Sequence, residues 1–303
     1  MPLSASVFVP AHISGFFQPY YAITPERSGS RNCGPCLNLG VFTDVEVERA
    51  NRASIKIHVN GKYVPDAKTT LEAVKRLQRM VHGKFKVEIN HSCQVPIGAG
   101  YGASGAGSLG AVLAFSKALE LNMPQERLVT AAHSAEVLCH TGLGDVGAQA
   151  IAGLVMGVKP GAPPYGKWSR VSFPPKMKLI CATLGSISTK KLLPNVKFRK
   201  RTNELGGMAM RKMLIAPDLQ RFISVSRDFA EKLGFLDDEL RGLIKSAEKS
   251  GALGASQSML GRSIFAFVNE KKIDLAYDSF LDVLEPASVM VADIYNKGLS
   301  ALV

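Results

Sequence analysis

Hydrophobic residues recur with a period of two along several short segments in the first third of the chain. This alternation, together with β-branched residues, predicts strands at residues 6–9, 37–48, 55–59 and 85–89. Asn60-Gly61 lies between two of these strands and is typical of a tight hairpin turn, because both residue types accept a positive φ. Helical spacing over residues 70–82 predicts one helix. The first third is therefore expected to be α+β, with a mainly antiparallel sheet.

From residue 108 onward the hydrophobic spacing becomes helical. Two apolar faces predict two helices, the first with Leu109, Val112, Phe115 and Leu119 and the second with Leu128, Ala131, Ala135 and Leu138. The second helix carries His133, Glu136 and His140 on its opposite face, which either meets water or lines a site. A zinc site from these three residues would lack the usual HExxH spacing.

Proline and glycine are densest at residues 159–166, which favours a domain boundary there. Strands are predicted again beyond it, near 178–184 and 263–268. We therefore expect an N-terminal domain of residues 1–162 and a C-terminal domain of residues 163–303.

The composition is that of a globular protein in a reducing compartment. The chain has 303 residues, 46% of them hydrophobic, and no apolar run reaches 18 residues, so no membrane span is expected. The N-terminus lacks the pattern of a secretory signal, and we expect a cytoplasmic protein. The five cysteines include Cys33-Gly34-Pro35-Cys36, which has the spacing of a redox pair. A redox pair needs a following helix, whereas a strand is predicted after Cys36, so free thiols are expected.

The net charge of +12 is unevenly distributed. Residues 176–212 contain ten Lys or Arg residues and one acid, Glu204. Such a segment can bind nucleic acid or phosphate, or can be a solvated basic face. Phe198 is the one aromatic residue within it that could stack on bases, which favours the solvated face.

A glycine-rich segment at residues 95–107 follows a predicted strand and leads into a predicted helix. Glycines let the backbone approach phosphate oxygens, and the helix that follows offers unpaired N–H groups and the positive end of its dipole. The segment is therefore a candidate phosphate-binding loop.

The residues alone leave several types of loop to consider. A Walker A loop requires Gly-Lys-Ser/Thr, and the segment contains no lysine. A dinucleotide fingerprint is formally met by Gly100, Gly102 and Gly105, but Glu120, the acid near the required offset, ends the same helix instead of a second strand. This alternative and a purely structural glycine turn both stay open.

The pattern Pro96-x-x-x-Gly100-x-Gly102-x-Ser104-x-Ala106 resembles the second signature motif of the GHMP kinases. A later glycine-rich segment at 251–261 is similar to their third motif. Four further segments resemble the archaeal pantoate kinases within that superfamily: residues 9–17, 29–31, 132–137 and 141–146.

The resemblance implies the two-domain GHMP kinase fold, with an N-terminal, β-rich domain like ribosomal protein S5 and a C-terminal α/β sandwich domain. It also implies an enzyme that uses ATP and Mg²⁺ to phosphorylate a hydroxyl group of a small acid. Pantoate is the expected acceptor, with homoserine or mevalonate as alternatives. No nucleic acid or membrane partner is expected, and a homodimer is possible. A basic nucleic-acid-binding protein on a related scaffold is the alternative from another class.

The same resemblance implies roles for individual residues. The nucleotide would be bound by Pro96, Gly98, Gly100, Tyr101, Gly102, Ala103, Ser104 and Gly105. Ser104 and Glu136 would hold Mg²⁺, and Asp145 would lie beside the acceptor hydroxyl as base or orienting group. An alternative for Asp145 is an N-cap carboxylate.

The acceptor's carboxylate would be bound by Ser30, His133 and Thr189, with His12 and Arg31 as further candidates. His12 could equally be a core histidine, and Arg31 a surface residue near a turn. The sequence departs from the family pattern at two places. Gly157 stands where an arginine is expected, and Asn32-Cys33 stand where small residues are expected.

Overall fold

The fold is built around two β-sheets, and the computed structural model describes residues 2–186, 195–259 and 261–299. The strands of the first sheet are β1 (Leu3–His12), β2 (Phe16–Tyr20), β3 (Gly29–Arg49), β4 (Ser54–Val59), β5 (Lys62–Tyr63), β6 (Phe85–Cys93), β7 (Leu154–Lys159) and β8 (Lys167–Arg170). Their order is β5-β4-β6-β3-β7-β8, while β1 and β2 pair with the other edge of β3. Only β4 and β6 are parallel to each other among these described pairs.

The long strand β3 joins the two ends of this sheet. Its C-terminal half pairs with β1 and β6, and its N-terminal half pairs with β2 and β7. Side chains alternate between the two faces of a strand. Neighbouring residues near the start of β3 therefore point to opposite sides, which matters for the site described below.

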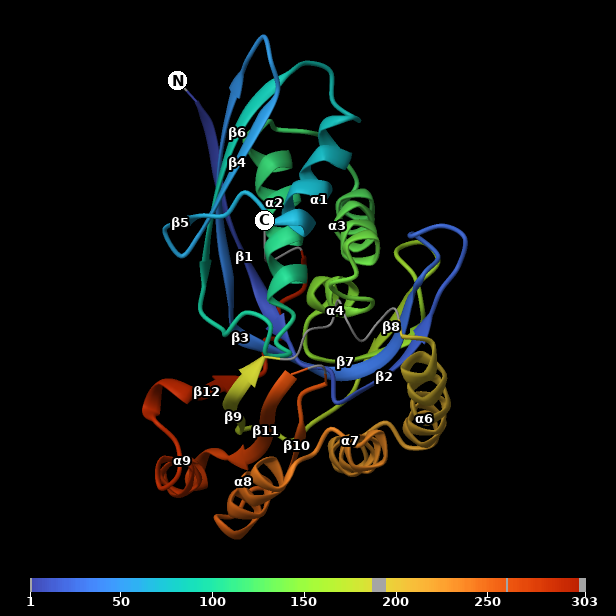
Figure 1. The fold of residues 1–303 in the computed structure, drawn as a ribbon, viewed down its shortest axis with the longest axis vertical. Coiled ribbons are helices and arrows are strands. Elements are labelled where there is room, and N and C mark those ends of the chain that lie inside the picture. The colour runs from blue at the N-terminus through green and yellow to red at the C-terminus, as the bar shows by residue number, and fades with distance from the viewer. Residues whose placement is uncertain (1, 187–194, 260, 300–303) are drawn as a thin grey trace.

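Four helices cover one face of the first sheet (Figure 1): α1 (Lys68–Gln78), α2 (Ala103–Ala118), α3 (Gln125–Cys139) and α4 (Asp145–Ile151). The central helix α2 packs against β1, β3, α1 and α3. Thirteen of its 16 residues are buried, and most are Gly, Ala, Ser or Leu. A helix that is apolar on all sides must be enclosed, so the core holds α2, and with it the loop before it, rigidly in place.

The second sheet has the order β10-β11-β9-β12 and lies below the first in Figure 1. Its strands are β9 (Met177–Ser186), β10 (Gly254–Gln257), β11 (Gly261–Asn269) and β12 (Val289–Asp293). Helices α7 (Leu219–Leu233), α8 (Asp238–Lys249) and α9 (Ile273–Leu281) pack against this sheet, whereas α6 (Val196–Ile215) packs against β2 of the first sheet and against α7. Two short 3₁₀ helices span Glu270–Lys272 and Pro286–Ser288. The aromatic rings of Phe222, Phe265 and Phe267 pack together in its core.

The α+β class and the mainly antiparallel first sheet are confirmed. The hairpin at Asn60-Gly61 has φ values of 49° and 76°, as the turn chemistry predicted. Two helix boundaries differ from expectation: the first helix ends at Gln78, and α2 begins at Ala103 because the glycine-rich loop forms its first turn. Leu138 is 48% exposed, so the predicted apolar face of α3 is wrong at that residue.

The sheet pairing bears on the division between the two parts of the chain. β8 lies beyond residue 162 but pairs with β7 in the first sheet, and the second sheet begins only at Met177. The pairing thus favours a boundary between β8 and β9, later than the expected division at 162/163.

The cysteines agree with the expectation of free thiols. No disulfide bond joins the five cysteines, all of which lie in the described ranges, and Cys33 and Cys36 are buried within β3 instead of preceding a helix. Burial raises the pKa of both thiols, because a thiolate is poorly solvated there. No helix in the described part of the chain is long and apolar enough to cross a membrane.

Candidate active site

A cavity of about 310 Å³ lies where the glycine-rich loop, the start of β3 and the start of α4 meet. Residues 97–98 and 100–104 form one wall, and residues 141–145 form a second. The remaining described lining comes from Ser14, Phe17, Ser30, Asn32 and Met259. Segments distant in the sequence therefore build a single site.

The backbone of the loop requires its glycines. Gly98, Gly100 and Gly102 have φ values of 78°, 88° and 62°, in the left-handed region that other residues rarely adopt. Gly102 is also the N-cap of α2, and no side chain caps this helix. The first N–H groups of α2 are consequently available to an anion.

The carbonyl groups of the loop are held by the protein. Those of Ala99 and Gly100 accept hydrogen bonds of 2.6 Å each from Ser263 and Ser258 Oγ. The next two carbonyls accept from the backbone N–H of His12 at 3.0 Å and from Gln149 Nε2 at 2.9 Å. A trans peptide unit points its N–H opposite to its C=O. Anchoring four successive carbonyls therefore turns the N–H groups of residues 100–103 the other way, toward the cavity.

The second glycine-rich segment, 251–261, thus holds the glycine-rich loop in place through Ser258. Besides Ser258, the Met259 N–H donates to the Ser14 carbonyl at 2.9 Å. A Cβ on Gly261 would lie 1.9 Å from the Ala99 oxygen, so only glycine permits this approach. The C-terminal part of the chain therefore shapes a loop that belongs to the N-terminal part.

Glu136 lies beneath the loop and is 1% exposed. Its Oε1 accepts hydrogen bonds from Ser104 Oγ at 2.6 Å and from Thr141 Oγ1 at 2.9 Å. Its Oε2 is buried and has no hydrogen-bond partner among the residues described. Burial, and then the negative charge of Asp145, raises the pKa of Glu136 to about 7. A cation near Oε2 would oppose both effects and lower this pKa.

Asp145 begins α4 and is positioned by His12. His12 Nδ1 donates to Asp145 Oδ1 at 2.7 Å, and the imidazole is fully buried, while the carboxylate is 23% exposed. A Cβ on Gly102 would lie 3.2 Å from Asp145 Cγ, so the phosphate loop adjoins this carboxylate directly. The N-cap of α4 is Gly144, so the alternative of Asp145 as N-cap is wrong.

Comparison with known proteins identifies the family. Residues 68–153 match the GHMP kinases N terminal domain. The chain is 32% identical to the pantoate kinase of Thermococcus kodakarensis, covering 96% of this chain and 95% of that protein. It is 29% identical to the pantoate kinase of Methanocaldococcus jannaschii, covering 88% and 94%. The chain belongs to the pantoate kinase family of the GHMP kinases.

Solved structures agree with this assignment. A structure described as a phosphotransferase related to the coenzyme A biosynthesis pathway has a TM-score of 0.88, with 29% identity and 97% coverage of both chains. A homoserine kinase from Cytophaga hutchinsonii has a TM-score of 0.71 at 20% identity, covering 98% of this chain and 97% of that one. The second likeness shows the fold, and the predicted GHMP kinase fold is thereby confirmed.

Most of the residues that family resemblance singled out meet at the cavity. Its described lining includes Gly98, Gly100, Tyr101, Gly102, Ala103, Ser104, Asp145 and Ser30. Pro96 and Gly105 flank the loop without lining the cavity. The Tyr101 hydroxyl lies 2.8 Å from Thr183 Oγ1, so this side chain anchors the loop to the second sheet.

Three predicted acceptor-binding residues do not line the cavity in the part of the chain that is described. Arg31 points away from it, because neighbours on a strand alternate, and its guanidinium donates to Gln18 Oε1. His133 is buried, and its Nε2 donates to the Ser28 carbonyl at 2.8 Å, which supports the segment before Ser30. His12 acts on the site through Asp145. Thr189 lies outside the described residues.

The two departures from the family pattern are neighbours. Asn32 and Gly157 face each other across β3 and β7. A Cβ on Gly157 would lie 2.5 Å from Asn32 Oδ1, so no larger residue fits at 157 while Asn32 keeps its position. Sequence reasoning noted both residues but missed that they are partners, and it assigned no role to Ser14.

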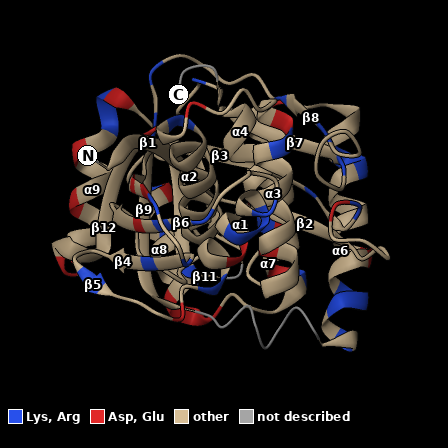
Figure 2. Cartoon of the chain, turned by 90° about the horizontal axis from the view of Figure 1, so that it is seen from above, with Lys and Arg blue, Asp and Glu red and all other residues tan. Residues whose placement is uncertain are grey.

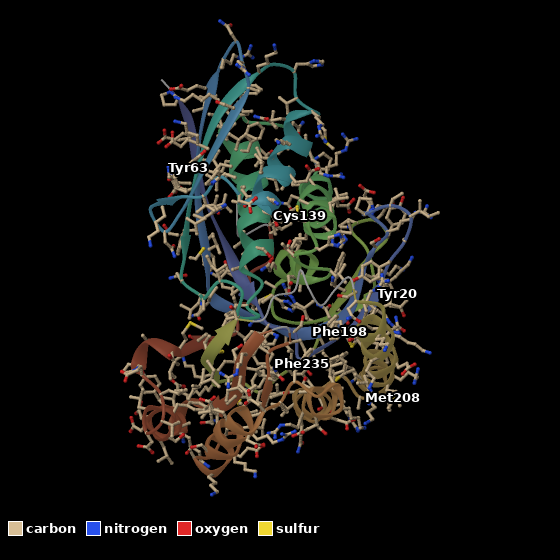
Figure 3. All side chains as sticks on the ribbon, in the orientation of Figure 1. Tyr20, Tyr63, Cys139, Phe198, Met208 and Phe235 are labelled. Atoms are coloured by element: carbon tan, nitrogen blue, oxygen red, sulfur yellow. The ribbon has the colours of Figure 1, made fainter. Side chains whose placement is uncertain are left out.

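The described Lys and Arg residues of the basic segment do not line the cavity. Figure 2 shows basic residues along α6 at the edge of the molecule. Lys178 pairs with Asp293 at 2.6 Å and Lys212 with Asp228 at 3.0 Å. Phe198 of α6 packs on Phe235, which follows α7, with ring centroids 5.7 Å apart; both are labelled in Figure 3. These contacts favour a solvated basic face over a surface that stacks bases.

Proposed function

We propose that this protein transfers the terminal phosphoryl group of ATP to the primary hydroxyl of pantoate, giving 4-phosphopantoate for coenzyme A biosynthesis. One observation carries the proposal. The glycine-rich loop and the carboxylate of Asp145 line one cavity, and a Cβ on Gly102 would lie only 3.2 Å from Asp145 Cγ. Phosphoryl transfer requires this combination, because its catalysis rests on positioning and on stabilisation of charge.

The loop amides and the N-terminus of α2 would bind the phosphates of ATP. Asp145 is the single charged side chain among the described residues that line the cavity. Backbone dipoles, with no basic side chain among these residues, would therefore supply most of the protein's attraction for the triphosphate. A cation is needed in addition, because a triphosphate would otherwise face two carboxylates.

Ser104 and Glu136 are the residues that would hold Mg²⁺. They fit this ion, because Glu136 Oε2 is a buried oxygen without a partner among the described residues, next to a hydroxyl at the mouth of the loop. Magnesium prefers a small number of protein oxygens together with water and phosphate oxygens. When bound, the ion would neutralise negative charge on the phosphates.

Asp145 would orient the acceptor hydroxyl or accept its proton. Its Oδ1 is occupied by His12, whereas no described residue bonds to Oδ2. The fixed imidazole restricts the carboxylate to one orientation, and this keeps Oδ2 available to the acceptor. The proton of the acceptor hydroxyl would move to Oδ2 as the oxygen attacks phosphorus.

The rest of the cavity fits pantoate. Phe17, Leu143 and Met259 contribute apolar surface that suits the two methyl groups of this acid. Ser30 offers a hydroxyl to the carboxylate, as the family resemblance implied. Homoserine would place a charged ammonium group in the same cavity, and mevalonate carries only one methyl group.

The test is product formation with purified protein, ATP, Mg²⁺ and one acceptor at a time. We expect ADP release and a phosphorylated product, identified by mass spectrometry, with pantoate and much less with homoserine or mevalonate. Turnover with another acid alone would contradict the proposed substrate, and no turnover with any of them would contradict the kinase assignment.

Light scattering of the same sample tests the possible homodimer.

A further inference from the structure

Asn32 is a buried amide in the wall of the cavity. The residue is 1% exposed, and its Nδ2 donates to Ser14 Oγ at 3.3 Å. Its Oδ1 is buried and has no hydrogen-bond partner within the described ranges. That oxygen faces Gly157, so the amide nitrogen is the atom turned toward Gly144 and the cavity.

The amide lies within reach of an acceptor whose hydroxyl is at Asp145. Gly144 directly precedes Asp145, and a Cβ on it would lie 2.4 Å from Ser30 Oγ and 2.8 Å from Asn32 Nδ2. Ser14, Ser30 and Asn32 therefore form a cluster of neutral polar groups one residue away from Asp145. All three line the cavity.

This cluster supplies hydrogen-bond donors, and the described lining of the cavity contains no positively charged side chain. A carboxylate can only accept hydrogen bonds, and it is best bound by groups that donate. The second hydrogen of Asn32 Nδ2 and the two serine hydroxyls can donate together. An acceptor whose hydroxyl lies at Asp145 would extend its other end along them.

Resting on the proposed function, we infer that Asn32 determines acceptor specificity: its amide nitrogen, aided by Ser14 and Ser30, binds the carboxylate of the acid. Recognition by neutral donors discriminates strongly, because an acceptor without the matching group leaves these buried donors unpaired. Asn32 is then a binding residue for the acceptor and has no part in nucleotide binding.

Gly157 makes this arrangement possible. The methyl group of an alanine at 157 would lie 2.5 Å from Asn32 Oδ1 and 3.5 Å from Trp168 Cδ1. Gly157 itself does not line the cavity. Gly157→Ala would therefore push the amide out of place while every side chain that lines the cavity keeps its chemical identity.

The experiment compares the Michaelis constants for pantoate and ATP in Asn32→Ala, Asn32→Asp and Gly157→Ala. We expect Asn32→Ala to raise the KM for pantoate on the order of 10- to 100-fold, with the KM for ATP changed less than about twofold. Asn32→Asp keeps the shape but sets a carboxylate against a carboxylate, so its increase should be larger. It should also shift preference from pantoate toward the neutral primary amide of pantoate. Gly157→Ala should raise the same constant.

Two controls match these changes. Asn38→Ala removes an exposed asparagine from the same strand, and Gly242→Ala adds a methyl group where no atom lies within 4 Å. Both should behave like the wild type. If Asn32→Ala does not fold, the isosteric Asn32→Asp and the Gly157→Ala variant, which changes a residue outside the cavity lining, decide.

An unchanged KM for pantoate in folded Asn32→Asp and Gly157→Ala would overturn the inference while leaving the proposed function intact. A parallel rise in the KM for both substrates would also overturn it, because it would assign Asn32 a purely structural role. Failure of the wild type to phosphorylate pantoate would instead refute the proposed function, and the inference with it.

Discussion

His12 Nδ1 donates a hydrogen bond of 2.7 Å to Asp145 Oδ1, although the two residues are 133 positions apart in the chain. His12 ends β1 and Asp145 begins α4, so the bond joins the first sheet to the second wall of the cavity. The imidazole is fully buried and cannot move to another partner without disturbing the core. The pair therefore sets the direction in which Asp145 faces the acceptor.

Asp145→Asn should abolish most turnover while nucleotide binding is retained. An amide cannot accept the proton of the acceptor hydroxyl, and loss of a general base typically lowers kcat by about 10²- to 10⁴-fold. Steady-state kinetics and calorimetric titration with a nucleotide analogue measure the two effects. Asp293→Asn is a matched control, since this aspartate pairs with Lys178 near the surface. Unchanged kcat in Asp145→Asn would refute the assigned role.

His12 should act as a positioning residue. We expect His12→Leu to lower kcat about 10- to 100-fold with little change in the KM for ATP, because Asp145 loses its fixed orientation. His12→Asn can place an amide N–H near the position of Nδ1, and it should recover part of this loss. If both variants lose stability equally and His12→Asn recovers no activity, the histidine is only a core residue.

The pH dependence of stability should reveal Glu136. Its pKa is raised to about 7 from 4.5, so the folded protein holds a proton that the unfolded chain releases. The stabilisation from this proton is fully present below pH 4.5 and is lost as the pH rises through about 7. We therefore expect Glu136→Gln, which mimics the protonated form, to raise the Tm of the nucleotide-free protein at pH 8 but not at pH 4.5.

Comparing the wild type with Glu136→Gln separates the effect of Glu136 on stability from the effects of the buried histidines. Burial lowers the pKa of His91 to about 4 and also lowers that of His133. Both histidines therefore reduce the stability of the folded protein only at low pH, and they do so equally in the wild type and in the variant. Glu46→Gln changes an exposed glutamate and should leave the pH profile as it is. Equal Tm differences at pH 4.5 and pH 8 would contradict the raised pKa. Mg²⁺ with nucleotide should stabilise the wild type more than Glu136→Gln.

Gly100→Ala should weaken nucleotide binding. Its φ of 88° is unfavourable for alanine, and the added methyl group would lie 2.6 Å from Ser258 Oγ, which holds the loop. We expect the KM for ATP to rise by at least about 10-fold and stability to fall by about 1–3 kcal/mol. Gly242→Ala is the control here as well. A variant with normal ATP affinity would show that the loop does not depend on this backbone conformation.

The sequence by itself predicted the parts of this protein whose signals are local. Local patterns predicted β1, β3, β4, β6, β9 and β11, but not β2, β5, β7, β8, β10 or β12. The Asn60-Gly61 turn appeared as its chemistry requires, and a glycine-rich loop before a helix marked the candidate phosphate site. Family resemblance added Ser104, Glu136 and Asp145, which lie around the cavity. These features depend on residues near one another in the chain, or on motifs with fixed spacing, so a linear reading can find them.

The tertiary structure decided what depends on residues that are distant in sequence. No spacing indicates that Ser258 and Ser263 hold the carbonyls of the loop, that His12 fixes Asp145, or that Asn32 needs a glycine at 157. The same holds for Arg31, whose side chain points away from the cavity although its neighbours Ser30 and Asn32 face it. Packing and hydrogen bonding bring such partners together only after the strands have paired and α2 is enclosed. Burial then sets their energetics, as the raised pKa of Glu136 illustrates.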